Sequence, residues 1–299
     1  MTFLYKADPQ RGAEWARLFA EKAPELAFRV WPDVGAAEDV RYLAAWQPPG
    51  ELMQTFPNLE IVFSVGAGID QFDFSAIPEH IPVLRMIEPG IAAGMVEYVT
   101  LAVLAIHRDW GSYAQQQRER IWREHPLRPA QARRVGVLGL GVLGQAVLAQ
   151  LRTLGFPCAG WSRSAHAIEG VACYSGNDGL AAFLAGTDIL ICLLPLTAAT
   201  RGILDKTVFD RLPGGAALIN VGRGGHLVQD DLLRALDDGR LSSAILDVCE
   251  PEPLPPDHPF WHHPRITLTP HIASITQPAT AVDVAVSYTH LTLPTNREV

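Results

Sequence analysis

Hydrophobic positions in the first third of the chain fall into short runs separated by polar stretches. Five runs have the length and apolar character of β-strands: TFLYKA, FRVW, VRYLAAW, EIVFSV and IPVLRM. The segment PQRGAEWARLFAEKA, between the first two runs, has apolar residues at helical spacing. Strands that alternate with helices are typical of a parallel sheet covered by helices, so this part is predicted to be a small open α/β domain.

A long apolar stretch follows, from about Met95 to Trp122, and contains VEYVTLAVLAIHRDW. Its apolar residues cover one broad helical face, which predicts a single helix between two domains. The proline-spaced segment HPLRPAQ comes next and reads as a linker.

A second α/β set begins at Arg133. Its strand-like runs are RVGVLGL, PCAGWS, DILICLLPL, GAALINVG, SSAILDV and RITLTP. The segment QDDLLRALDDG between two of them is predicted to be a helix that ends at glycine. Several of these runs are apolar at every position, as a parallel sheet covered on both faces requires. The chain is therefore predicted to be an α/β protein with two doubly wound parallel sheets, one in residues 1–95 and 275–299 and one in residues 96–274.

The segment RVGVLGLGVLGQAV contains Gly139, Gly141 and Gly144 in the spacing G-x-G-x-x-G. It follows a predicted strand and opens a predicted helix. In this context the first glycine allows a tight turn, the second lets the backbone approach a pyrophosphate, and the third allows close packing of helix and strand. The loop predicts a dinucleotide site at the helix N-terminus.

In an NAD site, the next strand usually ends in a carboxylate that binds the ribose 2′-hydroxyl, about 20 positions after the loop. Here that place holds Ser162, Arg163 and Ser164, and no acidic residue. Because a guanidinium can make bidentate charged hydrogen bonds to a 2′-phosphate, we predict that NADPH is preferred over NADH.

Three polar residues come at the ends of predicted strands in the second set. Arg223 follows ALINVG, Glu252 follows AILDV, and His271 follows ITLTP. Since ligands in open α/β sheets bind at the carboxyl ends of strands, these residues are expected to converge on one crevice. Nearby residues of the same types compete for these roles: Glu250, His258, His262 and His263.

The chemistry of these three side chains fits the reduction of a 2-keto acid. Arg223 can hold the carboxylate and polarise the carbonyl. His271 can give a proton to the developing alkoxide, and Glu252 beside it would favour the imidazolium and fix the ring. The residues therefore indicate an oxidoreductase acting on a small 2-keto acid.

Composition narrows the picture further. The formal charge of −8 argues against binding to nucleic acid or an anionic membrane surface, and 48% hydrophobic residues with 19% charged residues are typical of a globular protein. No apolar stretch approaches the roughly 20 residues that cross a bilayer, and the first residues, MTFLYKADPQRG, contain no long apolar run, so we expect neither a membrane span nor a signal sequence. We expect a cytoplasmic protein without a metal. Its cysteines, which lack CxxC spacing, are expected to be reduced core thiols: Cys158, Cys173, Cys192 and Cys249.

The motifs VLGLGVLG, LLPLTAATRGIL, LINVGRGGHLV, LDVCEPEPLP and TPHIA, taken together, resemble the D-isomer-specific 2-hydroxyacid dehydrogenase family over roughly residues 40 to 285. The resemblance implies a flavodoxin-like substrate domain and a Rossmann cofactor domain. It implies that Arg223, Glu252 and His271 are the catalytic residues, which removes Glu250 and the other histidines from consideration.

Further segments are similar to the members that reduce glyoxylate and hydroxypyruvate: AAWQPP, SVGAGID, MVEYV, WSRS and WHHPRITLTPHIASIT. The resemblance implies that the substrate contacts Trp46, Ala67, Gly68 and Arg223, and the glycine-rich turn among them has the character of an anion-binding nest. It implies a homodimer formed through the interdomain helix region. It also implies further cofactor contacts at Val142, Leu143, Pro195, Thr200, Val221 and Asp247, the last with the nicotinamide carboxamide.

The C-terminus departs from the family pattern. The family ends with a helix that returns to the first domain, whereas this chain ends VSYTHLTLPTNREV, which has no amphipathic period. From about Ser287 the sequence looks foreign or frameshifted.

Three alternatives stay open at this point. Glu252 disfavours an enzyme like formate dehydrogenase, which protonates no carbonyl. Length disfavours a phosphoglycerate dehydrogenase with a regulatory extension. A nucleotide-gated binding protein would bind NADPH without turnover.

Overall fold

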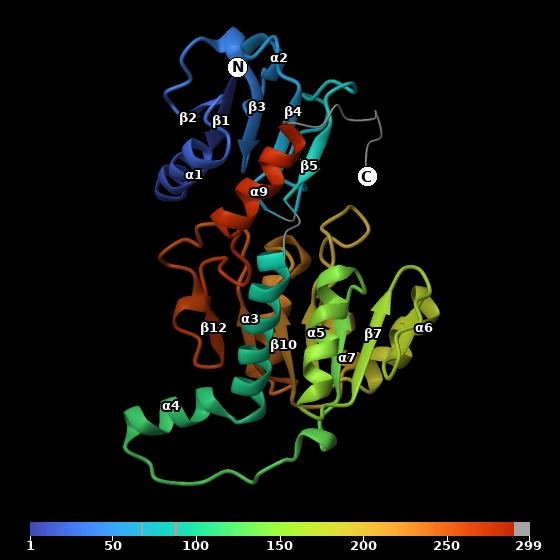
Figure 1. Cartoon of the computed structure of the whole chain (residues 1–299). Helices are drawn as coiled ribbons and strands as arrows, with labels where there is room; N and C mark the ends of the chain where they lie inside the picture. The colour runs from blue at the N-terminus through green and yellow to red at the C-terminus, as the bar shows by residue number, and fades with distance from the viewer. Residues whose placement is uncertain (67, 87–88, 290–299) are drawn as a thin grey trace. The chain divides into compact units, whose positions relative to one another are not determined.

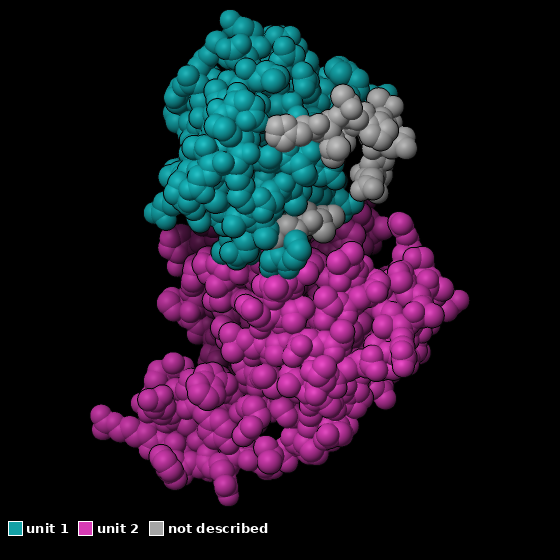
Figure 2. All heavy atoms as spheres, in the orientation of Figure 1, with its two compact units in different colours: residues 1–91, 275–299 teal, residues 92–274 magenta. Residues whose placement is uncertain are grey.

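The computed structural model describes residues 1–66, 68–86 and 89–289. The chain divides into two compact units, which are coloured separately in Figure 2. Unit 1 is Met1–Ile91 with Ile275–Val299, and unit 2 is Ala92–Ser274. Each unit contains one parallel sheet flanked by helices (Figure 1), which confirms the predicted fold class.

Unit 1 has a five-stranded parallel sheet in the order β2-β1-β3-β4-β5, the strand order of flavodoxin-like folds. All five predicted strands are present. Its elements are β1 (Thr2–Lys6), α1 (Pro9–Lys22), β2 (Ala27–Val30), β3 (Val40–Ala45), α2 (Leu52–Thr55), β4 (Ile61–Ser64), β5 (Val83–Arg85) and α9 (Pro278–Thr289), with a short 3-10 turn at Ala37–Asp39.

Helix α1 forms where the sequence predicts it, for two local reasons. The Asp8 side chain accepts a hydrogen bond from the Arg11 N–H at 2.9 Å, and Pro9 occupies the first helical turn, where its missing N–H costs nothing. The apolar face of the helix buries Trp15 and Phe19 against one face of the sheet. Helix α9 packs beside α1 (Figure 1) and buries apolar residues in the same cluster: Ala281, Val282 and Ala285.

Unit 2 has a seven-stranded parallel sheet in the order β12-β11-β10-β9-β6-β7-β8. The six strands from β8 across to β11 have the Rossmann strand order, and β12 lies beyond β11 at the edge of the sheet. The strands are β6 (Val135–Leu138), β7 (Cys158–Ser162), β8 (Ala172–Ser175), β9 (Ile189–Cys192), β10 (Ala216–Asn220), β11 (Leu241–Leu246) and β12 (Ile266–Leu268). The α-helices are α3 (Pro89–His107, which begins in unit 1), α4 (Trp110–Glu119), α5 (Val142–Thr153), α6 (Gly176–Ala185), α7 (Lys206–Arg211) and α8 (Gln229–Asp237), and 3-10 turns lie at Ala130–Ala132, Gly224–His226 and Pro259–Trp261.

The unit 2 sheet is buried on both faces, as its uninterrupted apolar strands require. Val135, Val137 and Ile219 lie in one core cluster with side chains of α3 and α5. Leu138 and Leu218 point to the other face and pack with side chains of α6, α7 and α8. The doubly wound arrangement holds the carboxyl ends of these strands at one edge, where the candidate site is built.

Two details of the predicted elements are wrong. The stretch from Met95 to Trp122 is not one helix, because the chain breaks between α3 and α4 at Asp109, which has a left-handed φ of 52°. The apolar face ends just before this residue, and aspartate tolerates the left-handed conformation better than most residues. Strand β8 was missed because its four residues form no apolar run and lie at the edge of the sheet.

Helix α3 also corrects the expectation that no segment is long and apolar enough to cross a bilayer. Its 19 residues pass that test by length and composition. Its inner face, however, packs in the unit 2 core through Met95, Val99 and Val103. The same length and composition are found in core helices of soluble proteins, so the helix is weak evidence for a membrane span.

Helix α9 extends to Thr289, beyond Ser287, where the sequence leaves the family pattern. Tyr288, which follows Ser287, packs at the edge of the unit 1 core, and the centre of its ring lies 6.3 Å from that of the Phe63 ring. Residues 290–299 lie outside the described part of the chain.

Candidate functional site

The glycine loop between β6 and α5 has the shape that a dinucleotide requires. Gly139 has φ of 107°, and a Cβ there would lie 2.7 Å from the Leu193 carbonyl oxygen. A Cβ on Gly144 would lie 1.9 Å from the Gly139 carbonyl oxygen, so only glycine fits at either place. At Gly141, by contrast, a Cβ would meet open space, which leaves the backbone accessible at the N-terminus of α5. Val142 is exposed beside it and Leu143 is half-buried. This loop fits a pyrophosphate.

The residues predicted to face the adenosine ribose follow β7. Arg163 and Ser164 are exposed, whereas Ser162 is buried and its Oγ donates to the Ser164 carbonyl oxygen at 2.7 Å. His166, which the motifs did not indicate, joins this group, with its Nδ1 2.9 Å from Ser162 Oγ. The described residues from 162 to 166 contain no carboxylate.

The other residues expected at the cofactor lie at the ends of β9 and β10. The Pro195 carbonyl oxygen accepts a hydrogen bond from Thr200 Oγ1 at 2.7 Å, so these two residues shape one exposed loop. Val221 is buried directly after β10, and its N–H donates to the Cys192 carbonyl oxygen at 3.2 Å. The segments that follow β9 and β10 therefore lie at the same carboxyl edge of the unit 2 sheet as the glycine loop, which follows β6.

Arg223 lies at the carboxyl end of β10, at the start of a short 3-10 turn. Its backbone N–H donates to Nδ1 of the fully buried His226 at 3.0 Å, and its Nη1 donates to the Gly222 carbonyl oxygen at 2.8 Å. Asn220 adds a bond from Nδ2 to the Arg223 carbonyl oxygen at 3.0 Å. The backbone that carries this guanidinium is thus fixed from several directions.

Glu252 and His271 form a direct pair. His271 Nδ1 lies 2.9 Å from Glu252 Oε2, and the other carboxylate oxygen accepts the Cys249 N–H at 2.9 Å. The carboxylate holds Nδ1 and so fixes the orientation of the imidazole ring.

The electrostatics of Glu252 keep it ionised. Burial alone would raise its pKa, but the hydrogen bond with His271, the Cys249 N–H and the charges of His271 and Arg223 together lower the pKa below its ordinary value. Arg223 is therefore close enough for its charge to act on this pair.

Asp247 organises the turn that carries His271. The residue is 2% exposed, and its Oδ1 accepts from Thr269 Oγ1 at 2.6 Å and from the Ile272 N–H at 2.8 Å. Its Oδ2 accepts the Ala273 N–H at 2.8 Å. Burial raises the pKa of Asp247, although these hydrogen bonds and the charge of His271 act in the opposite direction.

His271 itself has a left-handed φ of 54°, and its N–H donates to the Asp247 carbonyl oxygen at 2.8 Å. Asp247 thus holds an unusual backbone conformation at the candidate acid. A carboxylate can accept about four hydrogen bonds, so Oδ2 keeps capacity for one more donor.

Tyr98 on α3 extends this network. Its hydroxyl is hydrogen-bonded to Thr269 Oγ1, which in turn donates to Asp247. Burial, as the largest cause, raises the pKa of Tyr98 to about 12. Tyr98 and Thr269 thus support the turn that carries His271, and the sequence did not indicate them because their hydrogen-bond partners are distant in the chain.

The competing residues have structural partners elsewhere. Glu250 forms an ion pair with Arg201 Nη1 at 2.9 Å. His258 accepts the Phe260 N–H at the start of a 3-10 turn, and His263 lies 3.3 Å from an oxygen of Asp237. His262 is exposed at the end of that turn.

The remaining predicted substrate residues belong to unit 1. Trp46 follows β3 and is partly exposed, and its ring lies close against Gly66, where a Cβ would approach it to 3.3 Å. The Gly68 carbonyl oxygen accepts from Ser64 Oγ at 2.7 Å, which fixes this turn after β4. Ala67 lies outside the described residues.

Taken together, unit 2 combines a glycine loop for a pyrophosphate, a ribose region without an acid, and a histidine–carboxylate pair near an arginine. Such a set can hold a dinucleotide, bind an anionic substrate and move one proton.

Comparison with known proteins agrees with this geometry. Residues 100–273 match the family model described as the D-isomer specific 2-hydroxyacid dehydrogenase, NAD binding domain. The chain is 42% identical over 278 residues to a glyoxylate/hydroxypyruvate reductase A of Serratia proteamaculans, an alignment that covers 90% of this chain and 88% of the relative. The chain belongs to the D-isomer-specific 2-hydroxyacid dehydrogenase family. It is accordingly a nicotinamide-dependent oxidoreductase, as the motifs predicted.

Solved structures of this family are similar to this chain over most of its length. A D-isomer specific 2-hydroxyacid dehydrogenase of Xanthobacter autotrophicus Py2, in complex with NADPH and MES, has a TM-score of 0.88 and 38% identity, covering 96% of this chain and 92% of that one. An NADPH-dependent glyoxylate/hydroxypyruvate reductase of Sinorhizobium meliloti, in complex with NADP and sulfate, has a TM-score of 0.88 and 33% identity, covering 98% and 97%.

Proposed function

We propose that this dehydrogenase reduces glyoxylate and hydroxypyruvate to the corresponding D-2-hydroxy acids, with NADPH as its preferred cofactor. The observation that carries the proposal is the 2.9 Å pair of His271 Nδ1 and Glu252 Oε2, beside Arg223 and at the same sheet edge as the glycine loop. Several relatives that match most of this chain are named for those two substrates.

In this proposal, His271 transfers the proton. Glu252 fixes the ring through Nδ1, so Nε2 gives its proton to the carbonyl oxygen when that oxygen becomes an alkoxide. The ionised Glu252 stabilises the imidazolium before this transfer. In the reverse direction the neutral ring takes the proton back. A bound nicotinamide would supply the hydride that the carbonyl carbon receives.

Arg223 is the proposed substrate clamp. Its planar guanidinium can bind the substrate carboxylate in a bidentate manner and polarise the neighbouring carbonyl oxygen. The rigid backbone around it, bonded to His226 and Asn220, keeps the guanidinium in place without cost at the moment of reaction. We also propose Trp46, Ala67 and Gly68 of unit 1, the proposed substrate domain, as substrate-binding residues.

Unit 2 is the proposed cofactor domain. Gly139, Gly141 and Gly144 would hold the pyrophosphate, and Asp247 has one acceptor position free for the nicotinamide carboxamide. At the ribose, Arg163 and the absence of a carboxylate between residues 162 and 166 favour a 2′-phosphate.

A panel of 2-keto acids assayed with NADPH and NADH at matched concentrations tests this proposal. We expect the highest kcat/KM with glyoxylate or hydroxypyruvate and NADPH. Tight NADPH binding without turnover on any 2-keto acid would instead favour a nucleotide-gated binding protein. A tenfold preference for NADH would contradict the proposed role of Arg163.

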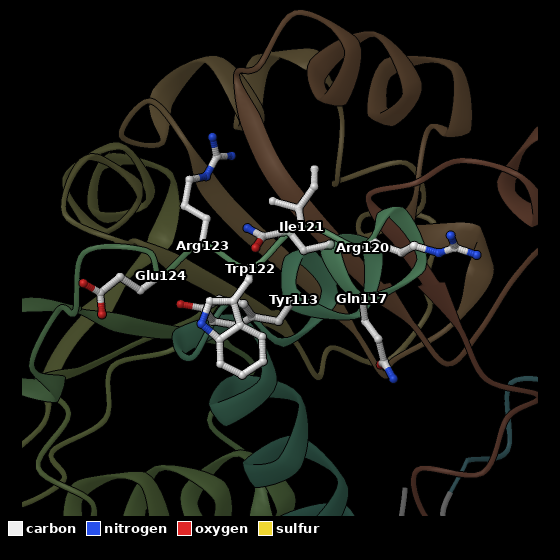
Figure 3. Close-up of a pocket in the computed structure, with 8 residues that line it drawn as sticks. Tyr113, Gln117, Arg120, Ile121, Trp122, Arg123 and Glu124 are labelled. Atoms are coloured by element: carbon white, nitrogen blue, oxygen red, sulfur yellow. The ribbon is translucent and has the colours of Figure 1, made fainter.

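We further propose that two copies associate through the region of α3 and α4, as a cytoplasmic homodimer. Apolar side chains are uncovered there: Trp110 is 70% exposed, Leu127 is 77% exposed and Trp122 is fully exposed. Within the apolar 18-residue stretch of α3, only 28% of the residues are buried. The end of α4 and the following segment also line a hollow of about 590 Å³ (Figure 3). Such a surface calls for a partner of matching apolar character, and a second copy of the chain supplies one.

Sedimentation analysis of a Trp110→Ser, Trp122→Ser double variant tests the dimer. We expect the wild type to sediment as a dimer and the variant as a monomer. Trp261→Ser, which changes an exposed tryptophan elsewhere in unit 2, is the control and should remain dimeric. A wild-type monomer would contradict the proposal.

A further inference from the structure

The loop after β7 carries a second basic side chain besides Arg163. His166 is exposed, and its Nδ1 lies 2.9 Å from Ser162 Oγ and 3.1 Å from the Ser164 carbonyl oxygen. The Ser162 hydroxyl donates its own hydrogen to that same carbonyl oxygen at 2.7 Å. The imidazole is therefore tied to the short segment in which a dinucleotide-binding domain recognises the ribose substituent.

These contacts decide which ring nitrogen carries the hydrogen. A carbonyl oxygen only accepts, and the Ser162 hydroxyl hydrogen is already used, so both oxygens beside Nδ1 act as acceptors. Nδ1 is consequently the protonated nitrogen in both charge states. The nitrogen that changes with pH is Nε2, which presents a lone pair in the neutral ring and an N–H in the imidazolium.

We propose that the imidazolium of His166 donates from Nε2 to the 2′-phosphate of NADPH, next to Arg163, and that the contribution of His166 to the preference for NADPH over NADH therefore rises as pH falls. This rests on the proposed function, in which NADPH is the cofactor. The neutral ring has no hydrogen on Nε2 and cannot make this bond. The imidazolium adds a charge-assisted hydrogen bond to those of Arg163, so NADPH binding takes up a proton.

Among the described residues, the ring of His166 forms no ion pair. Its own loop carries the charged residues Arg163 and Glu169. The neighbouring elements contribute these titratable groups: Cys173 and Tyr174 on β8, and Asp178 on α6.

The 2′-phosphate also titrates, and its effect has the opposite sign. A phosphate monoester loses its second proton near pH 6, so Arg163 binds it more strongly at higher pH. The wild-type profile alone therefore mixes two effects. Comparison with His166→Gln, which keeps a polar side chain but does not titrate, isolates the histidine. His166→Lys keeps the positive charge across the whole range, and His262→Gln removes an exposed histidine outside the loop.

The first measurement is the ratio of kcat/KM with NADPH to kcat/KM with NADH, between pH 6 and 8.5, on saturating glyoxylate. Taking the ratio cancels the titration of His271, which both cofactors share. We expect the wild-type ratio to exceed that of His166→Gln by about fivefold at pH 6 and to converge with it by pH 8.5. His166→Lys should keep its advantage at pH 8.5, and His262→Gln should follow the wild type.

The second measurement needs no turnover. Calorimetric titration of the protein with 2′,5′-ADP at pH 7.5, in two buffers of different ionisation enthalpy, reports the protons taken up on binding. We expect net uptake by the wild type and none by His166→Gln. Identical pH profiles and identical proton uptake in these two proteins would overturn the role of His166 while leaving the NADPH preference intact. A chain that prefers NADPH at no pH would overturn the proposed cofactor, and this inference with it.

Discussion

Thr269 lies in a hydrogen-bonded chain that runs from Tyr98 to Asp247. We predict that Thr269, which has no proposed role in catalysis or binding, influences His271, the proposed general acid. Replacing Thr269 with valine keeps the shape of the side chain but removes the hydroxyl, which donates to Asp247 Oδ1 at 2.6 Å. A hydrogen bond to a charged group contributes about 1.5–3 kcal/mol, and the Tyr98 hydroxyl would lose a bond of about 1 kcal/mol. We therefore expect Thr269→Val to lower the free energy of unfolding by about 2.5–4 kcal/mol.

The same change should loosen the turn in which His271 adopts its left-handed backbone. If about half of the lost energy acts on the orientation of this turn, kcat falls about tenfold, since about 1.4 kcal/mol corresponds to a factor of ten in rate. KM should change little, because Arg223 is untouched. Urea unfolding and steady-state kinetics measure the two effects.

Two variants make this test specific. Thr269→Ser restores the hydroxyl and should recover most of kcat. Thr187→Val removes another buried hydroxyl of unit 2, which donates to the Phe183 carbonyl oxygen at 2.8 Å, and should lower stability without lowering kcat. Equal kcat values for Thr269→Val and the wild type would refute the reasoning.

Three further predictions concern the proposed catalytic residues. His271→Ala should lower kcat by about 10²–10⁴ with little change in KM, as loss of a general acid does; an unchanged rate would remove the residue from this role. Arg223→Lys should raise KM and lower kcat, reducing kcat/KM about 10- to 100-fold because the bidentate fork is lost. Glu252 has a lowered pKa, so its contribution to stability is complete above its ordinary value of 4.5 and disappears as pH falls through the folded value. Thermal unfolding of Glu252→Gln should therefore show a deficit at pH 7 that closes in acid.

Much of the fold could be predicted because local patterns and tertiary packing agree. The strands of unit 2 are apolar at every position and lie in a sheet covered on both faces. The break at Asp109 and the edge strand β8 could not be predicted, since a left-handed residue and a half-buried edge leave no periodic signal. Such features depend on tertiary contacts between residues that are distant in the sequence.

The candidate site divides in the same way. Arg223, Glu252 and His271 could be chosen because they follow strands that share one sheet edge, and the structure brings Glu252 and His271 into direct contact. Their supports could not be chosen. His226 and Thr269 act through hydrogen bonds whose geometry depends on how loops fold back on the strands.

The most direct test of the account is the stereochemistry and cofactor use of one reaction. Purified protein is supplied with hydroxypyruvate and NADPH, and the glycerate formed is resolved on a chiral column while NADPH oxidation is followed by absorbance. The account predicts one D-glycerate for each NADPH consumed. Formation of the L-isomer, or no NADPH oxidation with either hydroxypyruvate or glyoxylate, would contradict it.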